Sequence, residues 1–153
     1  MIYTRRYRYR FGDIDDAGIA YYPKFFHYYH CCFEDWWSDA LGTPYPSVLH
    51  DEEFGLPVVS VQADFFSPIR YGDTPDISLG VLSIGTTSVQ FGFWMTQPGA
   101  TAASASARIT TVAMHMTRRV KVPVPERHRA AFERYRIDPS EFPSRPDAGD
   151  AAR

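Results

Sequence analysis

The sequence predicts one α+β domain in which a five-stranded antiparallel sheet wraps around a single long helix. Two observations lead to this prediction. The long helical pattern over residues 23–41 is amphipathic and rich in aromatic side chains. One strand pattern precedes it and four follow it with short connections, which implies antiparallel pairing. The strand patterns cover residues 2–11, 56–66, 76–84, 88–96 and 102–116. A chain of 153 residues is long enough for one such core.

Aromatic and basic side chains alternate near the N-terminus, which is typical of a half-buried strand. Aromatic residues predominate on one side of this alternation and basic residues on the other. The mainly aromatic side carries Tyr3, Arg5, Tyr7, Tyr9 and Phe11. We therefore expect this side to face the core.

The long helix is bounded by residues with clear conformational preferences. Pro23 suits the first helical position, and Gly42 with Pro44 beyond it suits the end. At about 100° per residue, one broad arc of the helix is mainly aromatic. This arc comprises Phe25, Phe26, Tyr29, Cys32, Phe33, Trp36, Trp37, Ala40 and Leu41. His30 falls inside the arc, so we expect it to find a hydrogen-bond partner in the core or at an interface.

The later strands are separated by turns that contain glycine and proline. A short helical turn is expected at residues 47–50, and a short amphipathic helix over residues 123–136. Residues 139–153 are rich in Pro, Asp, Ala and Ser. We therefore predict a domain over residues 1–138 followed by a disordered C-terminal tail.

The composition narrows the classes of function. Sixteen Lys and Arg against eighteen Asp and Glu leave a net charge of −2, which gives no reason to expect nucleic acid or a membrane as a partner. No apolar stretch has the length of a signal sequence or membrane span, so a cytoplasmic protein is expected. Cys31 and Cys32 are adjacent on the predicted helix, where their side chains diverge. We expect reduced thiols and no metal site.

The strongest functional signal lies just before the long helix. The segment from Phe11 to Pro23 reads F-G-D-I-D-D-A-G-I-A-Y-Y-P, and it places three carboxylates in a glycine-containing loop. Acids in such loops often only form turns or cap helices. The whole string, however, resembles the active-site segment of the 4-hydroxybenzoyl-CoA thioesterase family, the hot-dog-fold acyl-CoA thioesterases. The match is close from Phe11 to Phe26, and the order of elements agrees up to about Pro125.

This resemblance implies roles for particular residues in thioester hydrolysis. The second acid of the G-D-x-D pattern, Asp15, would be the catalytic carboxylate, acting either as nucleophile or as general base. The backbone N–H of Tyr22 would polarise the thioester carbonyl, and Gly18 would let the backbone approach the substrate. Tyr22 and Phe25 would flank the acyl group, and the named family suggests an aromatic one. Asp16 stands where the family often has proline.

The remaining substrate-binding candidates have weaker support. Asp13 is included among them, although its preferred role is to order the loop by accepting bonds from backbone N–H groups. Some members of the family carry an Arg/Lys cluster in the turn where this chain has Gly85-Thr86-Thr87-Ser88. Thr86, Thr87 and Ser88 are therefore the candidates for phosphate binding in that turn. Because it contains no cation, a thioester of an acyl carrier protein stays an alternative to acyl-CoA.

Two rival functions remain open at this point. A hot-dog dehydratase or isomerase would use His30, and a binding module would hold acyl thioesters without hydrolysing them. Glu34 is a competing carboxylate but lies on the polar side of the helix. The chain has no P-loop, dinucleotide fingerprint or nucleophile-elbow serine, and we expect neither cofactor nor metal. Uncovered sheet edges predict a homodimer with shared active sites, and the resemblance implies a homotetramer.

Overall fold

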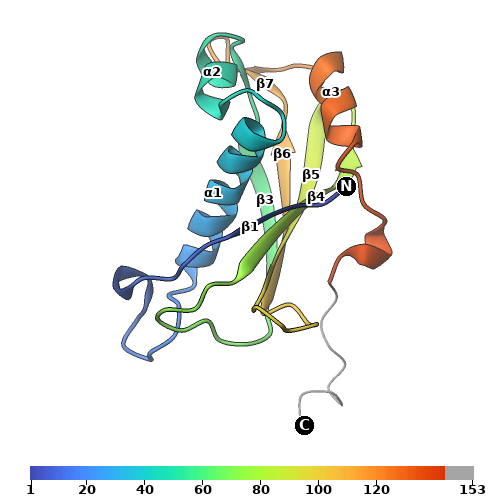
Figure 1. Ribbon diagram of the computed structural model, residues 1–153. Coiled ribbons are helices and arrows are strands. Elements are labelled where there is room, and N and C mark those ends of the chain that lie inside the picture. The colour runs from blue at the N-terminus through green and yellow to red at the C-terminus, as the bar shows by residue number, and fades with distance from the viewer. Residues whose placement is uncertain (144–153) are drawn as a thin grey trace.

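The computed structural model describes residues 1–143 (Figure 1). One long helix packs on one face of a five-stranded sheet, and the C-terminal segment covers part of the other face. The strands of this sheet are β1 (Tyr3–Arg6), β3 (Val58–Phe65), β4 (Asp76–Ile84), β5 (Ser88–Thr96) and β6 (Ala105–Val112). The helices are α1 (Pro23–Asp39), α2 (Tyr45–His50) and α3 (Glu126–Glu133), with 3₁₀ turns η1 (Phe11–Asp13) and η2 (Pro139–Glu141). The predicted α+β architecture is confirmed.

The sheet is antiparallel throughout and has the strand order β1-β4-β5-β6-β3. Alternate residues of its central strand β5, including Phe91, Phe93 and Met95, point toward α1 and are buried. Strand β3 forms one edge of the sheet, and its side chains are largely exposed. The sheet therefore has a buried centre, and its longer edge strand, β3, is exposed.

Helix α1 keeps the boundaries that the sequence indicates. Pro23 is its first residue, and Gly42 follows its end with a φ of 73°, a left-handed conformation that suits glycine. The aromatic arc packs into the core, where the ring centroids of Phe33 and Trp36 lie 5.4 Å and 5.8 Å from that of Phe91. Aromatic contacts with β5 thus help to hold the long helix on the sheet.

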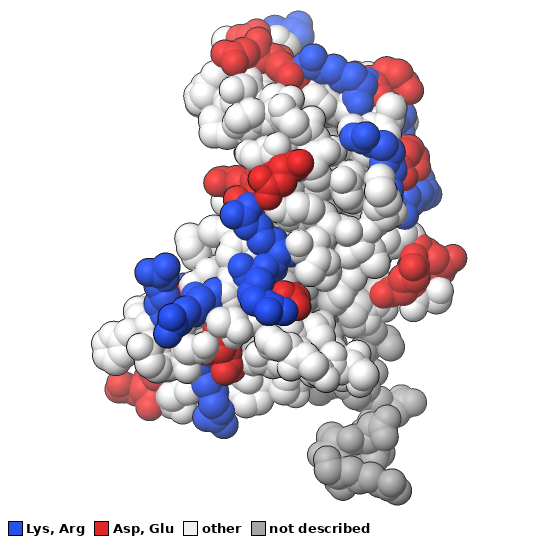
Figure 2. Space-filling model, viewed as in Figure 1, with Lys and Arg blue, Asp and Glu red and all other residues white. Residues whose placement is uncertain are grey.

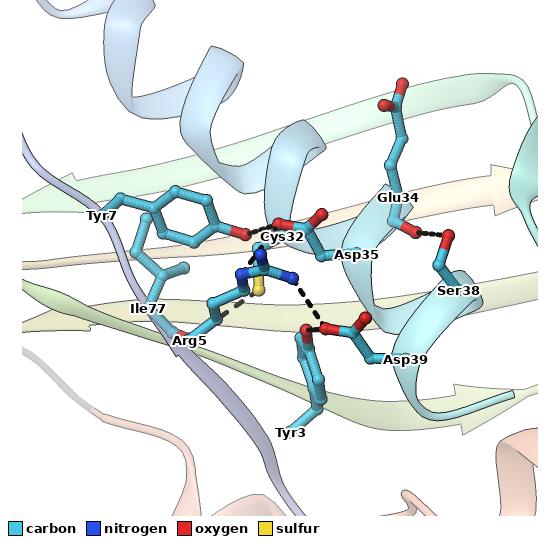
Figure 3. Close-up of polar contacts among 9 residues, drawn as sticks. All are labelled: Tyr3, Arg5, Tyr7, Cys32, Glu34, Asp35, Ser38, Asp39 and Ile77. Atoms are coloured by element: carbon cyan, nitrogen blue, oxygen red, sulfur yellow. Dashed lines mark hydrogen bonds and ion pairs between the residues drawn. The ribbon is translucent and has the colours of Figure 1, made fainter. Parts of the chain in front are cut away.

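Polar contacts fix α1 to the strand beside it, as Figure 3 shows. The hydroxyl of Tyr3 donates to Asp39 at 2.8 Å, and the Arg5 guanidinium donates to the same carboxylate at 2.6 Å. Tyr7, just after β1, donates to Asp35. These contacts hold the start of the chain against the middle and end of the helix.

A second, smaller sheet lies above the first and differs from the sequence prediction, which included only one sheet. It has the order β2-β7-β8 and is built from Phe54–Gly55, Met114–His115 and Val120–Lys121. Strands of two residues are too short to show an alternating pattern, so the sequence carries no signal for them. Together with α2 and α3, this sheet closes the end of the core near the C-terminus of α1.

The C-terminal segment packs on the sheet face opposite α1. Gly80 and Gly92 face it, and a Cβ atom on either glycine would lie within 3 Å of Ile137 or Phe142. The sequence pattern puts the end of the domain at residue 138, whereas the structure has η2 and a buried Phe142 beyond that position. The rest of the expected tail, residues 144–153, lies outside the described residues.

The first strand differs from its prediction at its end. Tyr9 is fully buried as expected, but Phe11 is 86% exposed because the extended backbone stops before it and η1 begins there. The alternation of side chains therefore ends before Phe11, and the paired strand β1 ends at Arg6, short of the predicted residues 2–11. Within residues 1–143, no helix is both long enough and apolar enough to cross a membrane.

Candidate active site

The acidic loop forms a small hairpin between η1 and α1. An isolated antiparallel bridge joins Ile14 to Ala20, and the Asp15 N–H donates to the carbonyl of Ile19 at 3.0 Å. The carboxylate of Asp15 is exposed and accepts the N–H of Ala17 at 2.8 Å. That single bond leaves acceptor positions of the carboxylate open to water or substrate.

Gly18 forms the turn of this hairpin. Its φ of 75° lies in the left-handed region, and its N–H donates to the Asp15 carbonyl at 2.9 Å. A Cβ atom at this position would meet no heavy atom within 4 Å. Glycine is therefore required here by backbone conformation, and the space beside it is open.

Asp13 occupies a different environment from Asp15. It is buried, and its carboxylate accepts the N–H of Arg10 at 2.8 Å and the hydroxyl of Tyr28 at 2.7 Å. The Lys24 ammonium lies 3.2 Å away. Burial by itself would raise the pKa of Asp13, but these three donors together hold it below its ordinary value. Asp13 is thus an ionised group that ties the loop to α1.

The start of α1 presents a backbone donor. Among the described residues no acceptor is found for the N–H of Tyr22, and Pro23 after it has no N–H to offer. The Tyr22 side chain is 61% exposed. A free N–H at a helix N-terminus is suited to stabilise negative charge on a carbonyl oxygen.

A cavity of about 460 Å³ lies between α1 and the β3 edge of the sheet. Most of its lining is aromatic or aliphatic. The lining comprises Phe26, Tyr29, His30, Phe33, Tyr45, Leu49, Leu56, Pro57, Val58, Val61, Phe91, Phe93, Ile109, Thr111 and Met116. The volume is within the range of about 300–1,000 Å³ that is typical of small-molecule sites. The residues from α2 and Met116 have no local sequence signal, because only the fold brings them here.

Two aromatic neighbours on α1 take different positions. Phe25 is buried and packs edge-on against Phe65 of β3, with ring centroids 4.9 Å apart, and it does not line the cavity. Phe26, on the next residue, lines the cavity instead. Because side chains advance by about 100° per residue, Phe25 and Phe26 point in different directions from the helix.

His30 is not enclosed in the core of the single chain, and its expected place at an interface stays a prediction. Its side chain is 60% exposed, and its Nε2 lies 2.9 Å from Oε1 of Glu34, one helical turn later. His30 is at the margin of the aromatic arc and lines the cavity while most of its side chain stays exposed. Glu34 is also exposed, as its place on the polar side of the helix indicates.

The structure does not bring the threonine turn to the acidic loop within one chain. Thr86, Thr87 and Ser88 lie at the end of β4 that points toward α3, whereas the acidic loop lies near the beginning of β4 (Figure 1). Nine residues of β4 separate the two ends, about 30 Å at ~3.3 Å per residue. Among the described residues, no group of three or more His, Cys, Asp and Glu side chains is arranged to hold a metal ion.

Comparison with known proteins places these features in a family. Residues 9–132 match the family model of the thioesterase-like superfamily. A 1,4-dihydroxy-2-naphthoyl-CoA hydrolase from Rippkaea orientalis is 30% identical over 128 residues, which cover 81% of this chain and 88% of that protein.

Two solved structures show the same fold. One is a 1,4-dihydroxy-2-naphthoyl-CoA thioesterase from Synechocystis, 23% identical, with a TM-score of 0.78 over 86% of this chain and 96% of that one. The other is a gentisyl-coenzyme A thioesterase, also 23% identical, with a TM-score of 0.74 over 83% and 99%. The family resemblance carried by the acidic loop is confirmed. The chain belongs to the thioesterase-like superfamily of hot-dog-fold proteins and is a thioester hydrolase.

Proposed function

We propose that the protein hydrolyses an aromatic acyl-CoA to the free acid and CoA, with Asp15 as the central carboxylate. The observation that carries this proposal is the pairing of an accessible Asp15 with a free Tyr22 N–H on one loop. The names of relatives that act on 1,4-dihydroxy-2-naphthoyl-CoA support an aromatic acyl group.

The loop offers both groups that the reaction needs. Asp15, as the carboxylate ion, either attacks the carbonyl carbon or removes a proton from an attacking water. In both cases the carbonyl oxygen gains negative charge, which the Tyr22 N–H stabilises. Collapse of that intermediate breaks the carbon–sulfur bond and releases the CoA thiolate. In the first case water then hydrolyses the aspartyl anhydride.

The apolar cavity supplies a place for the acyl group. Its walls include Phe26, Phe33 and Phe91, whose rings suit a flat aromatic group. It begins one helical turn beyond Tyr22, because Phe26 follows Tyr22 by four residues on α1. His30, at the rim of this cavity, is a polar side chain that could contact the acyl group and contribute to specificity.

We also propose that the active unit is a homodimer joined along β3. This edge exposes Val58, Val59, Val61 and Phe65, between 44% and 58% of each side chain. A long apolar edge strand is a template for pairing with another strand. Two copies related by a two-fold axis would pair these edges antiparallel.

Antiparallel pairing has a consequence for the site. Phe65 contacts Phe25 near the acidic loop, while Val58 lines the cavity at the other end of β3. In the dimer the loop of one copy would therefore approach the cavity end of the other. The threonine turn at residues 86–88 would move toward the partner's loop in the same way. A homotetramer and a cytoplasmic location remain predictions from the sequence.

The decisive experiment compares two neighbouring acids. Thiol release from aryl-, short-chain and long-chain acyl-CoAs is measured for wild type, Asp15→Asn and the control Asp16→Asn. We expect Asp15→Asn to lower kcat about 100-fold or more while its circular dichroism spectrum is unchanged. Asp16→Asn should retain most activity, because Asp16 is also exposed but lies outside the family's catalytic position. An active Asp15→Asn enzyme would contradict the proposal.

Two alternatives give different results in the same assay. A carrier-protein thioesterase would release thiol from acyl carrier protein but not from any CoA ester. A dehydratase or isomerase that relies on His30 would lose activity in His30→Ala and keep it in Asp15→Asn. The hydrolase names of the relatives favour acyl-CoA hydrolysis over both.

A further inference from the structure

A second hollow, of about 310 Å³, opens on the surface and is lined by Arg8, Arg10, Phe11 and Tyr71. All four side chains are exposed, and the two rings retain 86% (Phe11) and 63% (Tyr71) of their accessible surface. Figure 2 shows basic side chains gathered over the corner of the molecule where η1 and the loop before α1 lie in Figure 1. Two aromatic rings and two guanidinium groups therefore line one hollow, a combination suited to a ligand that carries both a flat ring and negative charge.

The backbone directs both arginines to the same side. Tyr9 between them is fully buried, its N–H donates to the Asp73 carbonyl at 2.9 Å, and its carbonyl accepts the Gly72 N–H at 3.1 Å. In an extended segment neighbouring side chains point in opposite directions. Because Tyr9 points into the core, Arg8 and Arg10 both point to solvent.

The turn that carries Tyr71 is held rigidly. The carboxylate of Asp73 accepts hydrogen bonds from the Arg70 N–H at 2.8 Å and from the Gln97 side-chain amide at 2.7 Å. The backbone N–H of Asp73 donates to the Arg70 carbonyl. Gly72 takes a φ of 86°, which this turn requires. The Tyr71 ring is therefore presented from a fixed backbone while the ring itself stays uncovered.

The charges in the hollow are available. Arg5 and Arg6, nearby in sequence, are paired with Asp39 and Asp76. Within residues 1–143, neither Arg8 nor Arg10 has a carboxylate at ion-pair distance. Guanidinium groups without a partner bind phosphate well, because their planar N–H groups match two phosphate oxygens.

We propose that this hollow binds the adenosine 3′,5′-bisphosphate end of CoA, an inference that rests on the proposed function. Arg8 and Arg10 would contact phosphate, and Phe11 or Tyr71 would stack on adenine, as aromatic side chains stack on bases elsewhere. The hollow lies beside the start of the acidic loop: the Asp13 N–H donates to the Arg10 carbonyl at 3.0 Å, and the Arg10 N–H donates to the Asp13 carboxylate at 2.8 Å.

A nucleotide site in this hollow would supply the cations that the threonine turn lacks in its own sequence and would cover the exposed rings of Phe11 and Tyr71. The threonine turn at residues 86–88 contains no cation of its own, and the Arg129 guanidinium beside it already donates to the Gly85 carbonyl at 2.6 Å. An acidic carrier protein would also be attracted to arginines, but it carries no purine to cover exposed rings. The two aromatic rings therefore favour the nucleotide end of CoA over a carrier protein.

The test compares a substrate that carries the nucleotide with one that lacks it. One acyl group is offered as its CoA ester and as its pantetheine ester, which lacks the nucleotide. For Arg8→Ala/Arg10→Ala we expect KM for the CoA ester to rise about tenfold, with kcat and the pantetheine ester unaffected. The matched control Arg118→Ala/Arg134→Ala also removes two exposed charges and should behave as wild type. Tyr71→Phe should keep a low KM and Phe11→Ala/Tyr71→Ala should raise it.

A second measurement does not depend on catalysis. Isothermal titration calorimetry with adenosine 3′,5′-bisphosphate should show binding to wild type that is lost in Arg8→Ala/Arg10→Ala and kept in the control. Unchanged KM and unchanged binding in the arginine variant would overturn the inference. Equal rises in KM for the CoA and pantetheine esters would also overturn it, as would a rise in KM only in the control variant. If an acyl carrier protein ester is added to the panel, a rise in KM for that ester alone would overturn it too. If wild type hydrolyses neither ester, the proposed function fails, and the calorimetric result still decides whether the hollow binds the nucleotide.

Discussion

Asp13 and Asp15, two residues apart, are placed in opposite environments by the same hairpin. Asp13 is buried among Arg10, Tyr28 and Lys24, whereas Asp15 has one backbone donor and faces solvent. A buried carboxylate with three donors is fixed and cannot easily turn to a substrate. An exposed carboxylate with free acceptor positions can. This difference assigns Asp13 to holding the loop and leaves Asp15 for chemistry.

Replacing Asp13 tests that assignment through stability. Asp13→Asn removes the charge that Lys24 and the Tyr28 hydroxyl contact, so we expect the free energy of unfolding to fall by about 1–3 kcal/mol at pH 7. Urea unfolding measures it. Asp16→Asn is the control, because Asp16 is exposed, and it should leave stability nearly unchanged. Equal stability of both variants would contradict a structural role for Asp13.

The same residue predicts a pH dependence. The pKa of Asp13 is lower in the folded protein than its ordinary value of about 3.9, so its ionised form stabilises the fold. That contribution is present above pH ~3.9 and is lost as pH falls through the folded pKa. Urea titrations from pH 7 to pH 3 should therefore show a steeper loss of stability in wild type than in Asp13→Asn. Parallel curves would mean that Asp13 is not the group responsible.

At the scale of elements, the C-terminal segment and the sheet are matched in shape. Phe142 lies over Gly92 and under the Arg108 guanidinium, which is 4.4 Å from the ring centroid. We expect Phe142→Ala to lower the free energy of unfolding by up to about 3 kcal/mol. Gly92→Ala should also destabilise the protein, since the added Cβ would lie 2.7 Å from the Phe142 ring.

The double variant distinguishes contact from general damage. If the clash is with Phe142, Gly92→Ala should cost much less in the Phe142→Ala background, although Leu82 stays close at 3.2 Å. Chemical unfolding of the four proteins gives the coupling energy between the two positions. Strictly additive losses would show that the segment does not press on Gly92 in solution.

The elements also show which parts of the structure can be predicted from sequence. Helix α1 is predictable because Pro23 and Gly42 mark its ends and the aromatic arc is regular. Most of the large sheet follows from alternation and turns. The two-residue strands of the small sheet, and the covering of Gly92 by Phe142, arise from contacts distant in sequence. Local sequence patterns cannot predict contacts between residues that are far apart in the chain.

The candidate site divides in the same way. The acidic loop is contiguous, so its string of residues is enough to indicate the family. The hollow at Arg8 and Tyr71 joins segments that are far apart in sequence, and no local pattern connects those two residues. The sequence predicts His30 either in the core or at an interface, and the single chain excludes the core, because a helical arc has no sharp edge and a residue at its margin can face outward.

At the scale of the whole molecule, the exposed β3 edge predicts that a variant which cannot form the dimer also loses activity. Val59 is 58% exposed on that edge and does not line the cavity. Val59→Lys should disfavour edge pairing, because it places a charge where two strands would meet. Val120→Lys is the matched control, since Val120 is a 45% exposed valine in the small sheet.

The outcome is measured by light scattering after size-exclusion chromatography, together with thiol release at several protein concentrations. Wild type and Val120→Lys should elute as dimers or larger assemblies, and Val59→Lys should elute as a folded monomer with at least tenfold less activity at low concentration, because one loop would lack the partner's cavity end. Partial recovery at high concentration would follow from mass action. A fully active monomer would instead mean that each chain builds its site alone, and the acyl group would then have to reach from Asp15 to the cavity within one copy.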